Sequence, residues 1–85
     1  MSDELLLKIT ELASALMTPE EIGCLLDLNN SEVYSMKSKP DSQISKAYRK
    51  GRLKTKLELR KKIIQLAKAG SPQAELLADK YLKTN

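Results

Sequence analysis

The sequence of 85 residues has no histidine, phenylalanine or tryptophan, and it has a single cysteine, Cys24. Without histidine the chain lacks the most usual general base and the commonest metal ligand. One cysteine excludes an intrachain disulfide and a zinc site built from several thiolates. In a chain too short for a deep substrate pocket, these absences predict no catalytic residues, no metal, no cofactor and no small-molecule substrate.

Long hydrophobic runs are also missing, and no uncharged stretch is long enough to cross a bilayer. The first residues include Asp3 and Glu4 where a secretion signal would carry basic residues. We therefore expect a cytoplasmic protein that does not enter the membrane.

Charge is distributed very unevenly, although the formal net charge is only +4. Residues 1–32 contain seven acidic residues and one basic residue, whereas residues 37–62 contain eleven basic residues and two acidic ones. A basic segment of this density attracts polyanions. The plainer alternative is a solvated helix face that pairs with the acidic segment of a neighbouring copy.

Leucine, alanine, lysine, glutamate and isoleucine dominate and valine occurs once, which favours helices over strands. Capping residues and prolines divide the chain into five predicted helices, at about residues 3–16, 19–27, 29–38, 42–70 and 72–82. The expected class is all-α, a single small helical domain. Its parts are a three-helix unit over 1–40 and a long basic helix with a short final helix over 41–85.

Apolar residues recur at helical spacing and predict the buried sides of these helices. In the first two helices we expect inward-facing side chains at Leu5, Leu6, Ile9, Leu12, Ala13, Leu16, Ile22, Leu25 and Leu26. Cys24 has apolar neighbours and is expected to be a partly buried thiol rather than a nucleophile. Gly51 interrupts the long helix and marks either a kink or a close helix contact.

Residues 19–38 fit the spacing of a helix-turn-helix. This motif needs a small residue where its helices cross, a turn residue that tolerates left-handed backbone, and buried positions three apart in the second helix. Gly23 meets the first need, Asp27 the second, and Val33 with Met36 the third. Ile22, Leu26 and Leu28 supply the expected apolar neighbours.

The stretch from Glu21 to Tyr34 thus resembles a DNA-binding helix-turn-helix, and this resemblance implies a recognition helix over 29–38. Side chains near the start of such a helix contact base edges, and basic ones near its end contact phosphates. The implied DNA-binding residues are Asn29, Asn30, Ser31, Tyr34, Ser35, Lys37 and Lys39. Glu32 either accepts a hydrogen bond from a cytosine or caps the helix.

A second resemblance covers the C-terminal half. Residues 47–52, Ala-Tyr-Arg-Lys-Gly-Arg, precede a basic helix, an Ala-x-x-Gly-type corner and a last helix after Ser71-Pro72. This order is similar to bacteriophage and prophage terminase small subunits. The resemblance implies recognition of viral double-stranded DNA at packaging initiation by a homo-oligomer.

The long predicted helix carries nine basic residues between positions 46 and 62. Those in its first part are spaced to lie near one another, where they would contact phosphates beside the recognition helix. This predicted phosphate-binding set is Lys46, Arg49, Lys50, Arg52 and Lys54.

Other functions fit the same helical scaffold. One is a protein-interaction module, in which the basic residues serve solubility. A second is a small transcriptional regulator. A membrane-surface helix fits less well, because the basic segment lacks a bulky apolar face. The polar character of residues 30–38 favours DNA over a packed protein partner, while RNA stays open as a ligand.

Overall fold

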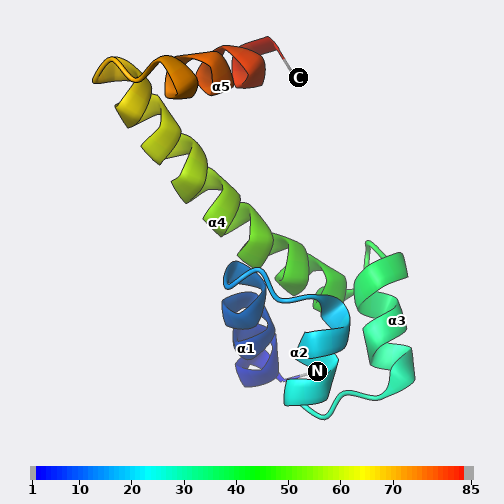
Figure 1. Ribbon diagram of the computed structural model, residues 1–85. Helices are drawn as coiled ribbons and strands as arrows, with labels where there is room; N and C mark the ends of the chain where they lie inside the picture. Colours follow the sequence, from blue (N-terminus) through cyan, green and yellow to red (C-terminus); the bar gives the residue numbers. More distant parts are fainter. Residues whose placement is uncertain (1, 84–85) are drawn as a thin grey trace. The chain divides into compact units, whose positions relative to one another are not determined.

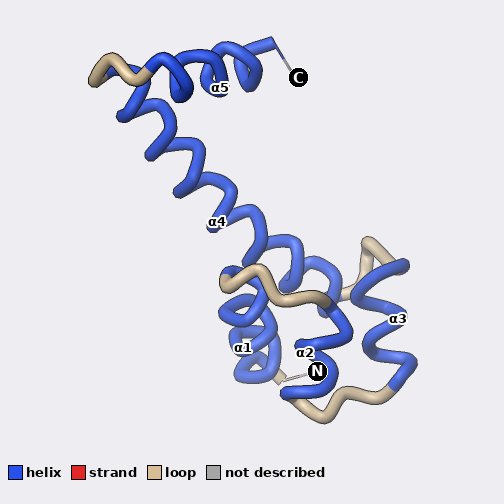
Figure 2. The backbone as a smooth tube through the Cα atoms, viewed as in Figure 1, coloured by secondary structure: helices blue, strands red, loops and turns tan. Residues whose placement is uncertain are grey.

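The computed structural model describes residues 2–83 and contains five α-helices and no strand within that range (Figures 1 and 2). The helices are α1 (Asp3–Ser14), α2 (Pro19–Leu25), α3 (Asn30–Ser38), α4 (Gln43–Lys68) and α5 (Pro72–Lys83). The predicted all-α class, with a long fourth helix and a short last one, is confirmed. None of these helices is both long and apolar enough to span a bilayer.

The chain divides between Thr55 and Lys56 into two compact units. We refer to residues 2–55 as the N-terminal unit and to residues 56–83 as the C-terminal unit. The boundary lies inside α4, so that helix belongs partly to each unit.

Each helix begins where its capping residue predicted. The Ser2 hydroxyl accepts a hydrogen bond from the Leu5 backbone N–H at 3.2 Å, which caps α1. Thr18 and Glu21 form a reciprocal capping box at the start of α2. The Ser42 and Ser71 hydroxyls accept bonds from the backbone three residues on and so cap α4 and α5. These local bonds satisfy N–H groups that have no partner within the helix.

Three helices, α1, α2 and α4, end about two residues earlier than predicted, and in α1 and α2 a burial prediction fails as well. α1 stops at Ser14, and Leu16 takes a left-handed backbone with φ of 64°. Leu16 is 50% exposed, because the helical spacing that would turn it inward no longer applies. α2 stops at Leu25, which faces solvent on the outer side of that short helix and is 57% exposed. The prediction that these two leucines are buried was wrong.

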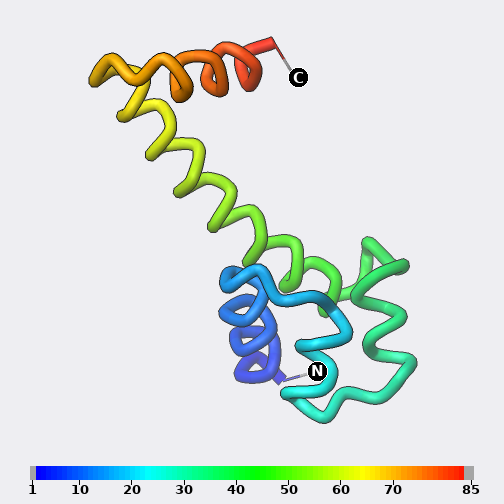
Figure 3. The backbone as a smooth tube through the Cα atoms, viewed as in Figure 1, coloured from blue at the N-terminus to red at the C-terminus, as the bar shows by residue number. Residues whose placement is uncertain are grey.

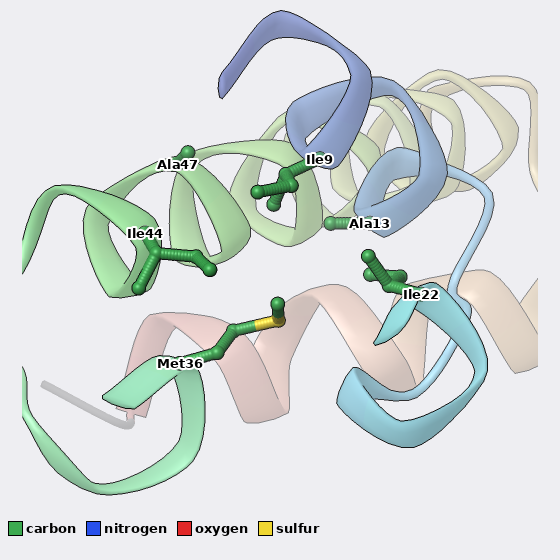
Figure 4. Packing of buried hydrophobic residues seen from close by; sticks show 6 residues of the cluster. All are labelled: Ile9, Ala13, Ile22, Met36, Ile44 and Ala47. Carbon is green, nitrogen blue, oxygen red and sulfur yellow. The ribbon is translucent and has the colours of Figure 1, made fainter. Parts of the chain in front are cut away.

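The core of the N-terminal unit is built from all four of its helices (Figure 4). Ile9, Ile22 and Met36 come from α1, α2 and α3 and are at most 2% exposed. Partly buried side chains surround them, and Tyr48 of α4 packs at the edge of this cluster. The remaining buried members of the cluster are Ala13, Ile44 and Ala47.

Contact between α1 and α4 is close, and Gly51 is the reason. A Cβ atom at this position would lie 2.7 Å from the Ala13 Cβ and 3.0 Å from the Ser14 backbone nitrogen. The Thr10 hydroxyl donates to the Ala47 carbonyl at 3.2 Å, and the Thr55 hydroxyl donates to the Ser14 carbonyl. Of the two interpretations of Gly51, the close helix contact is the one that the structure contains.

The C-terminal unit consists of the end of α4, a corner at residues 69–71 and α5 (Figure 3). Gly70 has a φ of 97° and makes the corner, which only glycine adopts easily. Ala74 is the one buried side chain among residues 56–83. The Arg60 guanidinium lies 4.5 Å from the centre of the Tyr81 ring. This unit therefore has almost no apolar core of its own.

Candidate nucleic-acid interface

The turn between α2 and α3 has the geometry that the helix-turn-helix spacing predicted. A Cβ atom added to Gly23 would lie 2.5 Å from Val33 Cγ2, so a larger residue here would force the Val33 side chain or α3 to shift. Asp27 takes the left-handed backbone conformation, with φ of 54°. The Leu28 N–H then bonds to the Gly23 carbonyl at 2.9 Å and closes the turn. This sequence of contacts fixes the position of α3 on α2 and the core (Figure 1).

Asn29 and Glu32 are occupied in starting α3. The Asn29 side-chain oxygen accepts from the Glu32 N–H at 2.8 Å, and the Glu32 carboxylate accepts from the Asn29 N–H at 3.0 Å. Glu32 is therefore a capping residue here. Asn29, predicted as a DNA contact, lies at the helix start with its oxygen already bonded.

The outward side of α3 is polar. Asn30, Ser31 and Tyr34 are exposed, as predicted for base contacts, and Tyr34 is 59% exposed. Ser38 shares this side, four residues after Tyr34, and is exposed as well. It was missing from the predicted set, although its spacing from Ser31 and Tyr34 was enough to find it.

Ser35 lies at the edge of this polar side and is half-buried. Its carbonyl accepts bonds from the Lys39 N–H at 3.0 Å and from the Ser42 hydroxyl at 3.3 Å. Its surroundings are therefore those of a residue at the junction of α3 and α4.

Lys37 points toward α2. Its ammonium group bonds to the Glu20 carboxylate at 2.5 Å, between two largely exposed side chains. The hydrogen bond from Lys37 is the main cause that lowers the pKa of Glu20, and the charge of Lys37 adds to it. The Lys37 ammonium group is thus exposed to solvent, but it is paired with the Glu20 carboxylate.

Two predicted phosphate contacts of α4 lie on the side of α3. The Arg49 guanidinium donates to the Pro40 carbonyl in the turn between α3 and α4. Arg49 also lines a cavity of about 410 Å³, together with Lys37 and the buried Ser45. Arg52 lies 5.6 Å from the centre of the Tyr48 ring. In the same region the Lys39 ammonium lies 6.0 Å from the Tyr34 ring.

The other predicted phosphate contacts lie toward α1. Lys46 and Lys50 line a second cavity, of about 420 Å³, together with Asp3 and Thr10. Lys54 follows one turn after Lys50 and is exposed. The predicted set is therefore exposed throughout, but it is divided between the α3 side and the α1 side of α4.

Cys24 is exposed on α2, so the expectation of a partly buried thiol was wrong. The reason is the shortness of α2, which buries Ile22 and Gly23 and leaves the next two residues outside. Residues 2–83 bring together no group of three side chains able to hold a metal ion.

Comparisons of the chain with protein-family models, with curated proteins and with solved structures found no match.

Proposed function

We propose that this protein binds double-stranded DNA through α3 and acts by binding rather than by catalysis. The polar outward side of α3 carries the proposal: Asn30, Ser31, Tyr34 and Ser38 are exposed, while Met36 of the same helix is buried. A helix that packs against a protein at this side would expose apolar residues instead. Amide and hydroxyl groups near the start of a recognition helix reach base edges in the major groove.

Two groups of cations supply the backbone contacts. Lys39, Arg49 and Arg52 lie nearest α3 and would hold the phosphates that flank the groove. The second group, Lys46, Lys50 and Lys54, extends the positive surface toward α1. Such contacts fix the register of a protein on the duplex without reading sequence.

The biological process follows from the resemblance to phage and prophage terminase small subunits. We infer that the chain recognises viral DNA for packaging, in the cytoplasm, as a homo-oligomer. A small transcriptional regulator built on the same scaffold is the alternative process. Both make use of α3, so a selection for preferred DNA sequence, followed by mapping of the selected site on a viral genome, separates them.

The test of DNA binding is fluorescence anisotropy with a labelled duplex of about 30 base pairs at several salt concentrations. If four to six phosphates are contacted, a plot of the logarithm of affinity against the logarithm of salt concentration should have a slope of about −4 to −5. The double variant Arg49→Glu with Lys50→Glu should weaken binding by similar factors on all sequences, since both residues contact phosphates.

Lys8→Glu is the control, because it reverses a charge at an exposed position of α1 outside the predicted interface, one reversal against the two of the test variant. It should leave affinity within about threefold. Binding that duplex RNA removes as readily as duplex DNA would contradict the DNA-specific proposal.

A second candidate, a protein-interaction module, is favoured by the exposed leucines of the C-terminal unit. No binding to duplex DNA even at low salt would favour this candidate over the first.

A further inference from the structure

The C-terminal unit leaves most of its large apolar side chains in solvent. Leu57, Leu59, Ile64 and Leu66 of α4 are 45–54% exposed, and Leu77 and Leu82 of α5 are 43% and 82% exposed. In addition, Arg60 Nε is buried without a hydrogen-bond partner within the described residues. These are the features of an incomplete core.

Units of fewer than about 40 residues usually need disulfides, a metal or association to become stable. Residues 56–85 contain neither cysteine nor histidine, which excludes a disulfide and the usual zinc ligands there. Association with another chain is the remaining means of stabilisation, and the arrangement of charge indicates which partner.

The side on which α4 meets α5 is marked by half-buried residues. On α4 these are Arg60, Ile63 and Ala67, and on α5 they are Ala78 and Tyr81, beside the buried Ala74. α5 turns back after the corner at Gly70, so α4 and α5 run in roughly opposite directions (Figure 1). In such a pair, the residues reached by turning the same way around each helix from its contact side lie on the same face of the unit.

One such face, which we call the bipolar face, is apolar at its centre and oppositely charged at its two edges. Leu57 and Ile64 of α4 and Leu82 of α5 occupy its centre. Its α4 edge carries Lys61 and Lys68, and its α5 edge carries Glu75 and Asp79. All seven residues are exposed, and Asp79 pairs with Lys83 of its own helix at 2.9 Å.

The opposite face has a different charge pattern. Leu59 and Leu66 of α4 and Leu77 of α5 form its apolar centre, but its edges carry Lys62 and Lys80. Two copies brought together through this face would place lysines near lysines, which opposes pairing.

We propose that the bipolar face binds the same face of a second copy. A two-fold axis along the helices places α4 of one copy over α5 of the other, so each lysine edge meets a carboxylate edge. The paired leucines then form the centre of a four-helix arrangement. This pairing rests on the self-association included in the proposed function and gives it a surface. The pairing of the two faces requires no contact with DNA.

Sedimentation of the full chain without DNA tests the inference. The average mass should rise with concentration from 9.5 kDa, the mass of one chain, toward twice that value. Lys61→Glu with Lys68→Glu should lower the association constant by about tenfold or more, and so should Glu75→Lys with Asp79→Lys. An equimolar mixture of these two variants should associate again, because its unlike chains have complementary edges.

The matched control is Lys62→Glu with Lys80→Glu on the opposite face, which should not weaken association. Equal loss in the control, a mixture that stays monomeric, or a single-chain mass at every concentration would each overturn the inference. Far-UV circular dichroism on each variant shows whether its helices are intact. In the mixture every chain still carries its two substitutions, so renewed association there reports complementary charge and not a return to the original sequence. DNA affinity is measured separately, so failure of the dimer and failure of DNA binding are distinct results.

Discussion

The N-terminal and C-terminal units are both helical, yet they bury apolar side chains to very different extents. The first places Ile9, Ile22 and Met36 out of solvent, with side chains from four helices around them. The second buries Ala74 alone among its described residues. Helical spacing of leucines is present in both, so the number of elements that converge decides which leucines become a core.

The largest expected effect comes from the core of the N-terminal unit. Ile9→Ala removes a fully buried side chain and should lower the free energy of unfolding by about 3–4 kcal/mol. Urea denaturation followed by circular dichroism measures this change. Leu76→Ala in the C-terminal unit, where the side chain is 74% exposed, should change stability by less than about 0.5 kcal/mol. Equal losses would remove the contrast between the units.

A smaller loss is expected at the crossing of α2 and α3. Gly23→Ala puts a methyl group 2.5 Å from Val33 Cγ2 and should cost about 2 kcal/mol, because either the half-buried Val33 side chain or α3 must shift. DNA affinity should fall as well if α3 is what moves. The neighbouring Cys24→Ala, at an exposed position of the same helix, is the control and should change neither quantity appreciably. Unchanged stability in Gly23→Ala would show that the crossing is looser than the structure indicates.

The cap of α3 should contribute less again. Asn29→Ala should destabilise the N-terminal unit by about 1 kcal/mol through loss of the capping box, and Asn29→Ser, another good cap, should restore most of it. Thermal unfolding measures both variants. If the serine variant regains stability but binds DNA more weakly, Asn29 contacts DNA in addition to capping the helix.

The smallest effect concerns pH. Because Lys37 lowers the pKa of Glu20, this carboxylate stabilises the fold at neutral pH, and the contribution disappears as the pH falls through the lowered pKa. Lys37→Gln should therefore raise the pKa of Glu20 toward its ordinary value. An NMR titration of the Glu20 side-chain carbon in the wild-type chain and in Lys37→Gln measures the shift. An unchanged pKa would mean that the ion pair is absent in solution.

Local features of the sequence predicted much of this fold. Every helix start was predictable, because a cap depends on residues three apart along the chain, such as Thr18 with Glu21. The left-handed turn at Asp27 and the small residue at position 23 were predictable from the helix-turn-helix spacing over residues 19–38. These local signals also placed Asn30, Ser31 and Tyr34 on the exposed side of α3.

Features that depend on distant parts of the chain were not predictable. Apolar spacing beyond Leu57 looks the same whether or not another helix covers it, so the exposure of those leucines needed the structure. Likewise, the pairing of Lys37 with Glu20 and of Arg49 with the Pro40 carbonyl depends on how helices approach one another. For this reason the cations predicted as one set are divided over two sides of α4.

Gly51 has a consequence for how this gene tolerates mutation. Two of the nearest atoms to an added Cβ, the Thr10 carbonyl oxygen and the Ser14 nitrogen, are backbone atoms of α1 and cannot rotate aside as a side chain can. In a library that varies every codon and is selected for folded protein, position 51 should retain glycine alone. The neighbouring codon for Arg52 should accept many amino acids, because its side chain is exposed. A position that accepts only glycine, among basic positions that accept many amino acids, would mark the place where α4 contacts the backbone of α1.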